Sequence, residues 1–360
     1  MAKKSKAAPS VQRTFNVAVI GAGAIGHDHI ASFQQHPAAR VVALAEVSPE
    51  RGRAAVDKFG IRDLVPDYRL LLKRADIDVI SIALPNYLHA PVALAALKAG
   101  KHVMIDKPMA TCAADAAKLV GEAKKQKVLL MVGQNQRFIP EVQTAKQLIT
   151  RGVLGEVYHA KTAWCRRSGI PRIGSWFTQA AYAGGGSTYD IGVHALDRCL
   201  YLMGEFEADA VSGQTYTQFG NRGLGGGDWG KSEIDPGAKF DVDDLSIALI
   251  RLKSGRTVLL ETSWAAHQPE GDINRTQLFG TQAGLDFPPL RLFRSTATGY
   301  SVEQVTAQPD LVDGNRMKHF IDCLLGAAQP HVLPAESLAV QKILDAIYRS
   351  AKSGREVRLR

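Results

Sequence analysis

The sequence predicts two domains: an α/β domain with a parallel sheet, followed by an α+β domain with an antiparallel sheet. The length of 360 residues and a hydrophobic content of 46% suit two soluble domains. Up to about residue 135, apolar strand-like runs alternate with helical segments, which indicates a parallel sheet covered on both faces. Beyond that point strand-like runs gather together, which favours an α+β domain. We therefore assign residues 14–135 to the first domain, 136–360 to the second, and the basic, polar residues 1–13 to a disordered tail.

Each expected strand of the first domain is a short apolar run, and helical spacing of apolar residues follows it. The expected strands are residues 15–20, 41–46, 77–84, 101–106 and 128–133. The expected helices are a segment beginning after residue 26 and residues 49–60, 89–100 and 111–126.

The second domain shows both periodicities. Helical patterns occupy residues 139–151, 188–203 and 334–352. Strand-like runs occupy residues 157–165, 208–219, 244–252, 256–264, 274–280 and 290–294. The turn KSGR joins the fourth run to the third, which suits an antiparallel hairpin. Residues 221–240 form a long glycine-rich loop.

The net charge of +9 argues against specific nucleic-acid binding once its distribution is considered. Residues 1–13 carry four Lys or Arg and no acid, and residues 349–360 carry five against one Glu. The two ends therefore supply +8 of the +9, and the body is close to neutral. Basic tails indicate solubility or weak adhesion rather than a recognition surface.

Cysteine spacing and hydropathy place the protein in the cytoplasm and away from the membrane. No apolar run approaches the ~20 residues of a membrane span, and the basic N-terminus lacks the apolar stretch of a secretory signal. The four cysteines are scattered without metal-site spacing, so we expect reduced cysteines and no metal.

The motif GAGAIG, residues 21–26, directly follows the first strand and opens a helix, which is the context of a dinucleotide-binding loop. Gly21 permits the tight turn, Gly23 lets a pyrophosphate approach the backbone, and Gly26 lets the helix pack closely on the sheet. We expect the cofactor to contact Gly21, Gly23, Ala24, Ile25 and Gly26.

Glu46 lies twenty residues beyond Gly26, at the end of the second strand, where an acid can accept hydrogen bonds from the adenosine ribose. A carboxylate there repels a 2′-phosphate, so NAD is the expected cofactor. Arg51 is near enough that NADP stays open as an alternative.

Two further loops follow strands at the carboxyl edge of the sheet, where ligands bind. In the first, Leu84, Pro85 and Asn86 are expected beside the cofactor; Asn86 can also cap the next helix. His89 has either a cofactor contact or a local role at the helix end.

The second loop, IDKPMA, holds Asp106 and Lys107. Pro108 restricts the backbone of Lys107, and the bond between them can be cis. A cation fixed beside a nicotinamide would stabilise the alkoxide that develops during hydride transfer.

The stretch GGGSTYDIGVHALD, residues 184–197, places Asp190 and His194 one helical turn apart. Ser187 or Thr188 can cap this helix, and we expect the glycines to leave room for cofactor and substrate. A histidine suits proton transfer near neutral pH.

In this order and spacing, GAGAIG, Glu46, PNYLH, DKP and GGGSTYDIGVH resemble the glucose–fructose oxidoreductase/inositol dehydrogenase/MocA (Gfo/Idh/MocA) family. The resemblance implies a Rossmann domain, then a domain with a large open, mostly antiparallel sheet that commonly builds homodimers or homotetramers. It implies hydride transfer between a nicotinamide and a hydroxyl of a sugar, glycoside or polyol, with Lys107, Asp190 and His194 as the catalytic set. The family usually has Glu-Lys-Pro, so the role of Asp106 is open.

The segment WCRRSGIPRIGSWF resembles a large subgroup of the family, in which oxidation at a ring 3-position is one expected reaction. Arg166, Arg167 and Trp176 are expected to border nicotinamide or substrate, with an interface or core role as the alternative. Gln134 completes the expected cofactor contacts, and Lys107, Arg166, Trp176, Asp190 and His194 the expected substrate contacts.

Several functional choices stay open from sequence alone. His194 is the first candidate for the base that takes the hydroxyl proton, and Asp190 can orient its imidazole or bind a neighbouring hydroxyl; Lys107 is the alternative base. Two other functions compete with a dehydrogenase: a redox-neutral, NAD-retaining glycoside hydrolase or epimerase-like enzyme, and a non-catalytic NAD-binding regulator.

Overall fold

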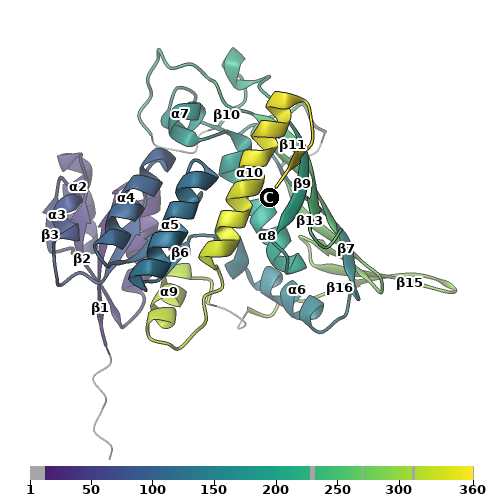
Figure 1. The fold of residues 1–360 in the computed structure, drawn as a ribbon, viewed down its shortest axis with the longest axis horizontal. Coiled ribbons are helices and arrows are strands. Elements are labelled where there is room, and N and C mark those ends of the chain that lie inside the picture. The colour runs from purple at the N-terminus through teal and green to yellow at the C-terminus, as the bar shows by residue number, and fades with distance from the viewer. Residues whose placement is uncertain (1–12, 228–231, 270, 310–312, 360) are drawn as a thin grey trace, which may run out of the picture.

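The computed structural model describes residues 13–227, 232–269, 271–309 and 313–359 (Figure 1). All but Arg13 of the tail expected at residues 1–13 lies outside the described residues, as do residues 228–231 of the glycine-rich loop.

The first domain contains a six-stranded sheet in the order β3-β2-β1-β4-β5-β6, with every neighbouring pair parallel. Its strands are β1 (Phe15–Ile20), β2 (Ala39–Ala45), β3 (Asp63–Val65), β4 (Val79–Ile82), β5 (His102–Ile105) and β6 (Leu130–Val132). Its helices are α1 (Ala24–Gln34), α2 (Pro49–Phe59), α3 (Arg69–Leu72), α4 (Asn86–Lys98) and α5 (Ala113–Gln126). The strand order reverses between β1 and β4, so the loops after these strands border a ligand crevice. The α/β prediction is confirmed.

The second domain contains a nine-stranded sheet in the order β16-β15-β14-β13-β7-β12-β11-β9-β17. All neighbouring pairs are antiparallel except β12 and β7. The strands are β7 (Val157–Cys165), β9 (Ala208–Tyr216), β11 (Leu245–Leu252), β12 (Thr257–Ser263), β13 (Ile273–Gly280), β14 (Gly284–Phe287), β15 (Arg291–Thr296), β16 (Gly299–Gln304) and β17 (Val357–Arg358). The expected hairpin is the antiparallel pair of β11 and β12.

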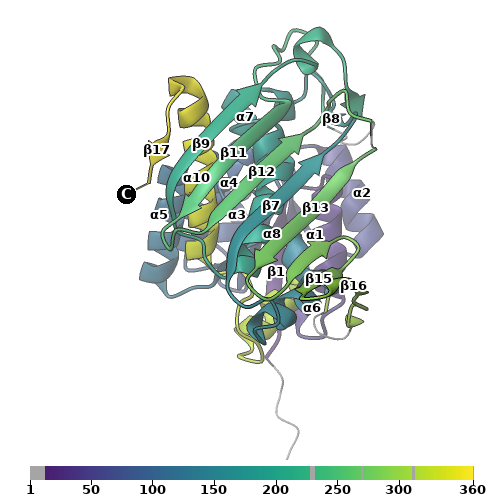
Figure 2. The ribbon, with the colours of Figure 1, turned by 90° about the vertical axis from the view of Figure 1, so that its right-hand side faces the viewer.

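Helices cover one face of this sheet and leave the other bare (Figure 2). On the covered face α8 (Val193–Met203) lies against β7, and α10 (Pro334–Ser353) lies against β9. A third helix, α6 (Pro140–Thr150), packs on α8. Helices α8 and α10 lie between the nine-stranded sheet and the first domain (Figure 1).

Helix α9 (Arg316–Leu324) returns the chain to the first domain. Met317, Phe320 and Ile321 are fully buried in the same apolar cluster as β1 and α1. The core around the first sheet therefore includes side chains of α9, which lies within residues 136–360 that we assigned to the second domain.

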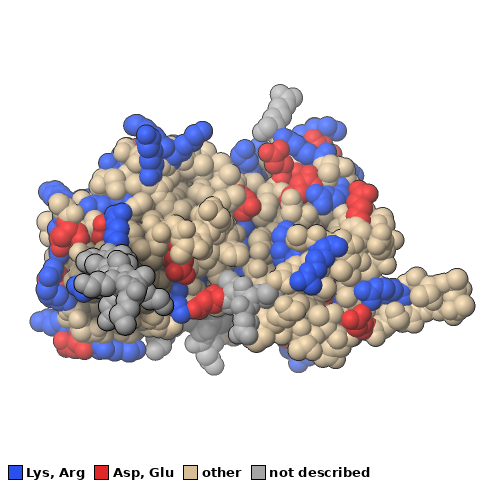
Figure 3. Space-filling model, turned by 90° about the horizontal axis from the view of Figure 1, so that it is seen from below, with Lys and Arg blue, Asp and Glu red and all other residues tan. Residues whose placement is uncertain are grey.

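Figure 3 shows Lys and Arg interspersed with Asp and Glu around the edges of one face. Among the described residues, no helix has both the length and the apolar composition that crossing a membrane requires. All four cysteines are free, and the described part of the chain holds no cluster of His, Cys, Asp and Glu suited to a metal ion.

Candidate active site

The glycine loop between β1 and α1 is shaped by close backbone contacts on its inner side. Gly21 has a φ of +100°, and a Cβ there would lie 2.3 Å from the Ala83 carbonyl oxygen. A Cβ on Gly26 would lie 2.0 Å from the Gly21 carbonyl oxygen. By contrast, no described atom lies within 4 Å of a Cβ placed on Gly23, and Gly23, Ala24 and Ile25 are exposed. The loop therefore offers an open surface in front of the N-terminus of α1, where an anion is stabilised.

Glu46 connects the glycine loop to the turn before α2. Its Oε2 accepts the Ala22 N–H at 2.8 Å, and its Oε1 accepts the Ser48 N–H at 2.9 Å and a bond from Arg51 at 3.1 Å. Burial raises the pKa of Glu46, but these hydrogen bonds and the Arg51 charge outweigh burial and lower the pKa below its usual value. The carboxylate is thus held ionised, and Oε2 retains capacity for a ribose hydroxyl.

Arg51 forms ion pairs with a carboxylate from each domain. Its guanidinium lies 3.1 Å from Glu46 and 3.1 Å from Glu233, which belongs to the glycine-rich loop of the second domain. Two carboxylates therefore flank Arg51, the residue that kept NADP open as an alternative in the sequence analysis.

The loop after β4 has a different arrangement from the one expected. Pro85 occupies the cap position of α4, and the Asn86 side chain instead donates to the Ala183 carbonyl at 2.8 Å. The cap expected at Asn86 is therefore wrong, because the side chain reaches across to the second domain. His89 is buried, with its ring nitrogens 2.7 Å from the Pro108 carbonyl and 2.8 Å from the Leu84 carbonyl. These contacts give His89 a local role in which it ties two loops together.

Lys107 and Asp190 bring the two domains together at the centre of the site. The Lys107–Pro108 peptide bond is cis. Lys107 Nζ donates to Asp190 Oδ1 at 2.7 Å and to the Asp190 carbonyl oxygen at 2.8 Å. Asp190 lies in a π-helical turn, Thr188–Gly192, directly before α8, and π-helical turns often mark functional sites.

Trp264 completes the hydrogen bonds of the Asp190 carboxylate. The indole N–H donates to Asp190 Oδ2 at 2.8 Å, and the Trp264 side chain is fully buried. The sequence analysis missed this residue. The available signal was a tryptophan at the end of the strand-like run 256–264, because a buried indole N–H needs an acceptor.

His194 lies in the first turn of α8, close enough to Lys107 for the lysine charge to act on its imidazole. Its side chain is buried, and Nδ1 has no hydrogen-bond partner among the described residues. Burial lowers the pKa of His194 well below its usual value, and the nearby charges of Lys107 and Arg316 lower it further. The imidazole is therefore neutral at pH 7. No hydrogen bond of the structure joins it to Asp190, whose carboxylate oxygens bond Lys107 and Trp264 instead.

The glycines before Asp190 pack against protein rather than opening space for a ligand. A Cβ on Gly185 would lie 2.1 Å from the Tyr348 hydroxyl, and one on Gly186 would lie 1.8 Å from the Asp243 carbonyl oxygen. The expectation that these glycines make room for cofactor and substrate is therefore wrong: both positions require glycine because Asp243, just before β11, and Tyr348 of α10 press against them.

Ser187 and Thr188 also differ from their expected capping role. Their hydroxyls both donate to Asp243 Oδ2, at 2.7 and 2.9 Å, and the Thr188 N–H donates to the same oxygen at 3.0 Å. Asp243 is buried and accepts a further bond from the Gly186 N–H. This carboxylate, which the sequence analysis did not single out, holds the turn that presents Asp190.

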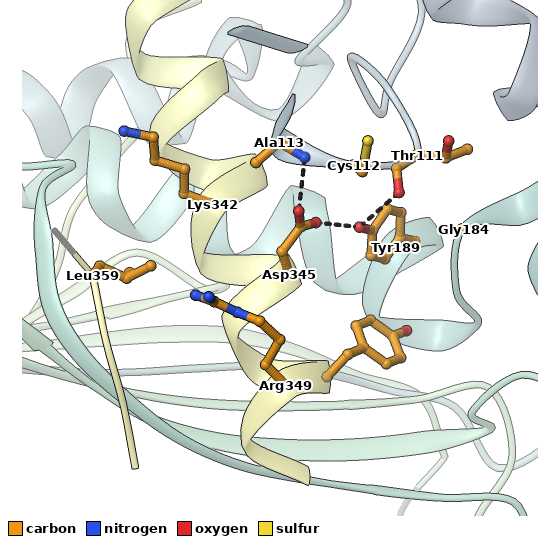
Figure 4. Close-up of a pocket in the computed structure, with 10 residues that line it drawn as sticks. Thr111, Cys112, Ala113, Gly184, Tyr189, Lys342, Asp345, Arg349 and Leu359 are labelled. Atoms are coloured by element: carbon orange, nitrogen blue, oxygen red, sulfur yellow. Dashed lines mark hydrogen bonds between the residues drawn. The ribbon is translucent and has the colours of Figure 1, made fainter. Parts of the chain in front are cut away.

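Tyr189 fastens the same turn from its other side (Figure 4). Its hydroxyl lies 2.6 Å from Asp345 Oδ1 and 3.2 Å from the Thr111 carbonyl, and Asp345 Oδ2 accepts the Ala113 N–H at 2.7 Å. These residues border a cavity of about 410 Å³ between α5 and α10. The contacts connect the loop after Lys107 to the turn that carries Asp190.

The remaining candidates make varied contacts. Trp164 packs on His194 with ring centroids 5.6 Å apart, and the Arg166 guanidinium lies 5.9 Å from the Trp164 ring. Trp176 stacks on Phe177 at 3.8 Å. Arg167 is exposed and donates to the Pro269 carbonyl, so the structure directs it toward the 269–272 segment.

At the carboxyl end of β6, Gln134 is buried, and its Oε1 has no partner among the described residues. Asp106 lies beside Gly133: a Cβ on Gly133 would be 3.0 Å from Asp106 Oδ1. Both therefore stand at the edge of the sheet that also carries Lys107.

Two family patterns cover most of this chain. The pattern described as "Oxidoreductase family, NAD-binding Rossmann fold" matches residues 15–134, and the "GFO/IDH/MocA C-terminal domain" matches residues 142–286. The chain belongs to the Gfo/Idh/MocA family of oxidoreductases. The resemblance of its motifs to that family is thereby confirmed.

Two named relatives are similar to this chain over most of its length. The D-glucoside 3-dehydrogenase of Escherichia coli (strain K12) is 30% identical over 351 residues, which is 95% of this chain and 97% of that protein. The levoglucosan dehydrogenase of Pseudarthrobacter phenanthrenivorans is 32% identical over 292 residues, 76% of this chain and 74% of that protein.

The fold is similar to that of solved structures of levoglucosan dehydrogenase. A levoglucosan dehydrogenase in its apo form has a TM-score of 0.85 at 26% identity, covering 97% of this chain and 99% of that one. A complex of levoglucosan dehydrogenase with NADH has a TM-score of 0.84 at 25% identity, covering 97% of this chain and 100% of that one.

Proposed function

We propose that this protein is an NAD-dependent dehydrogenase that oxidises a secondary hydroxyl of a sugar, glycoside or polyol. The observation that carries the proposal is the Lys107–Asp190 ion pair across the domain boundary, beside a buried neutral His194 whose Nδ1 has no partner among the described residues. The relatives named D-glucoside 3-dehydrogenase and levoglucosan dehydrogenase support a sugar substrate.

The residues present fit a nicotinamide dinucleotide. Gly23 opens onto free space at the start of α1, which suits the pyrophosphate. Glu46 keeps acceptor capacity for the ribose hydroxyls, and the buried Gln134 Oε1 can accept a hydrogen bond from the carboxamide. When bound, the nicotinamide supplies the hydride acceptor.

Within this proposal NAD is favoured over NADP by the charges around the adenosine. Glu46 would repel a 2′-phosphate, and Arg51, the cation that could offset this repulsion, is paired with both Glu46 and Glu233.

We assign the hydroxyl proton to His194. A neutral imidazole can accept a proton, and burial keeps His194 in that form. Lys107 uses two of its three donors on Asp190, which leaves one for the oxygen of the reacting carbon. That contact would stabilise the negative charge that develops on the oxygen as hydride leaves.

The ring 3-position is the proposed site of oxidation, on the strength of the relative named D-glucoside 3-dehydrogenase. Trp164 and Trp176 offer flat apolar faces for a sugar ring, and Arg166 stands beside Trp164.

A homodimer or homotetramer is proposed from the bare face of the nine-stranded sheet (Figure 2). Exposed apolar side chains occur along its strands: Tyr158, Tyr216, Ile247, Leu249 and Leu259. A face of this composition marks an association surface.

The test is a panel of sugars, glycosides and polyols assayed for reduction of NAD and, separately, of NADP. The expected result is NADH formation with a subset of the panel and far slower reduction of NADP. Lys107→Ala is the matched blank. If the purified protein carries retained nicotinamide and converts panel sugars without any net reduction of added NAD, a redox-neutral enzyme replaces the proposal.

A further inference from the structure

We propose that Trp264 is a positioning residue: its indole N–H holds the Asp190 carboxylate and, through it, the ammonium of Lys107. The inference deepens the proposed function and rests on it for its kinetic consequences. Trp264 is placed by its own backbone, whose N–H donates to the Asp244 carbonyl at 2.7 Å immediately after β12. Its ring is fully buried in a small apolar cluster with Ile170 and Ile191. The donor therefore has little freedom to leave Asp190.

The partners of the Asp190 carboxylate are both hydrogen-bond donors. Oδ1 accepts from the Lys107 ammonium, and Oδ2 accepts from the Trp264 indole. An indole N–H and an ammonium have no acceptor, so each group can only donate to the carboxylate. The two carboxylate oxygens are therefore held by donors from different domains.

This arrangement separates the roles of Asp190 and His194. With Oδ2 engaged by Trp264, the carboxylate is turned toward Lys107 and away from a bond to the imidazole. Asp190 then acts as the counter-ion that fixes Lys107 through two contacts, its carboxylate and its carbonyl oxygen. Without the indole N–H, Oδ2 would be a buried oxygen lacking a partner, and the carboxylate would be free to rotate away from Lys107.

Trp264→Phe tests the inference because it keeps most of the ring and removes the N–H. We expect kcat/KM to fall about ten- to a hundredfold, the usual effect of losing a hydrogen bond to a charged group. The loss should fall on kcat more than on KM, because the Lys107 ammonium acts on the charge that develops as hydride leaves. NAD affinity should not change. Ile170→Val is the matched control: it removes a methylene from the same cluster without touching a polar contact.

Combination with Asp190→Asn shows whether Trp264 acts through Asp190. We expect Trp264→Phe to have little further effect on kcat/KM when Asp190 is already Asn, because the two changes break one unit. If Trp264→Phe costs the same factor in both backgrounds, or lowers stability like Ile170→Val without lowering kcat, the positioning role is excluded.

A spectroscopic measurement keeps the inference separate from the proposed reaction. The protein has four tryptophans, so ¹⁵N-tryptophan labelling gives a small set of indole N–H signals, and loss of one in Trp264→Phe assigns it. We expect that signal to shift in Asp190→Asn and in Lys107→Ala. An unchanged signal in both overturns the inference. A shifted signal in a protein that oxidises nothing in the panel would uphold the geometry and reject the dehydrogenase.

Discussion

Lys107 Nζ lies 2.7 Å from Asp190 Oδ1, although the two residues belong to different domains and are separated by 83 positions in the chain. The first follows β5 of the parallel sheet, and the second lies in the turn before α8. Because the pair spans the boundary between the domains, the proposed reaction depends on both domains at a single point.

The proposed catalytic roles predict separate losses of turnover and cofactor binding. Lys107→Ala and His194→Ala should each lower kcat by orders of magnitude, since one removes the charge that stabilises the developing alkoxide and the other removes the base. NAD titration followed by fluorescence should give nearly unchanged affinity. Lys118→Ala, an exposed lysine on α5, is the control. Turnover close to wild type in both site variants would reject the assignment.

The charges around Glu46 predict the choice of cofactor. Glu46→Ala should lower the ratio of kcat/KM for NAD to that for NADP by about tenfold or more, because it removes the repulsion of a 2′-phosphate and releases Arg51. Asp57→Ala removes an exposed negative charge from α2, the helix that carries Arg51, and should leave the ratio unchanged. Equal ratios in wild type and Glu46→Ala would contradict the NAD preference.

The two groups of glycines predict opposite phenotypes. Gly186→Ala should destabilise the fold by about 3 kcal/mol or more, because its Cβ would overlap the Asp243 backbone. Gly23→Ala meets open space and should leave the urea midpoint close to that of wild type while weakening NAD binding. Urea unfolding and NAD titration of both variants check this, and a stable Gly186→Ala protein would show that the turn is looser than described.

Stability should also fall in mild acid because of His319. Burial and the charge of His331 lower the pKa of His319 to about 4, and its Nε2 accepts the His331 N–H at 3.1 Å. As pH falls from about 6.5 to about 4, the unfolded chain takes up this proton first, so stability decreases by up to about 3 kcal/mol. His319→Gln keeps an acceptor and should lose less stability between pH 7 and pH 4.5 in urea unfolding. Identical losses in the two proteins would argue against this origin.

The fold was predictable where apolar periodicity was strong. Strand β7 coincides with the expected run 157–165, and ten further strands begin within two residues of their expected starts. Strand β3 and strand β16 were missed for a physical reason: β3 has three residues, all half-buried, and every residue of β16 is exposed. Neither leaves an alternating apolar pattern.

The site was predictable only where motifs carry it. Lys107, Asp190 and His194 belong to recognisable segments, whereas Trp264 and Asp243 act through contacts more than fifty residues away. Local sequence also cannot show whether a glycine faces a ligand or another part of the protein. That is why Gly185 and Gly186 were interpreted wrongly, while the role of Gly21 agrees with its positive φ.

Helix α9 affects how the two domains fold during synthesis. The core around the parallel sheet is completed by Met317, Phe320 and Ile321, which are synthesised after eight of the nine strands of the second sheet. While the ribosome is still making the second domain, the nucleotide-binding half carries an uncovered apolar surface where α9 will later lie. Maturation of the first domain therefore has to wait for the last eighth or so of the chain, and its folding is coupled in time to that of its neighbour.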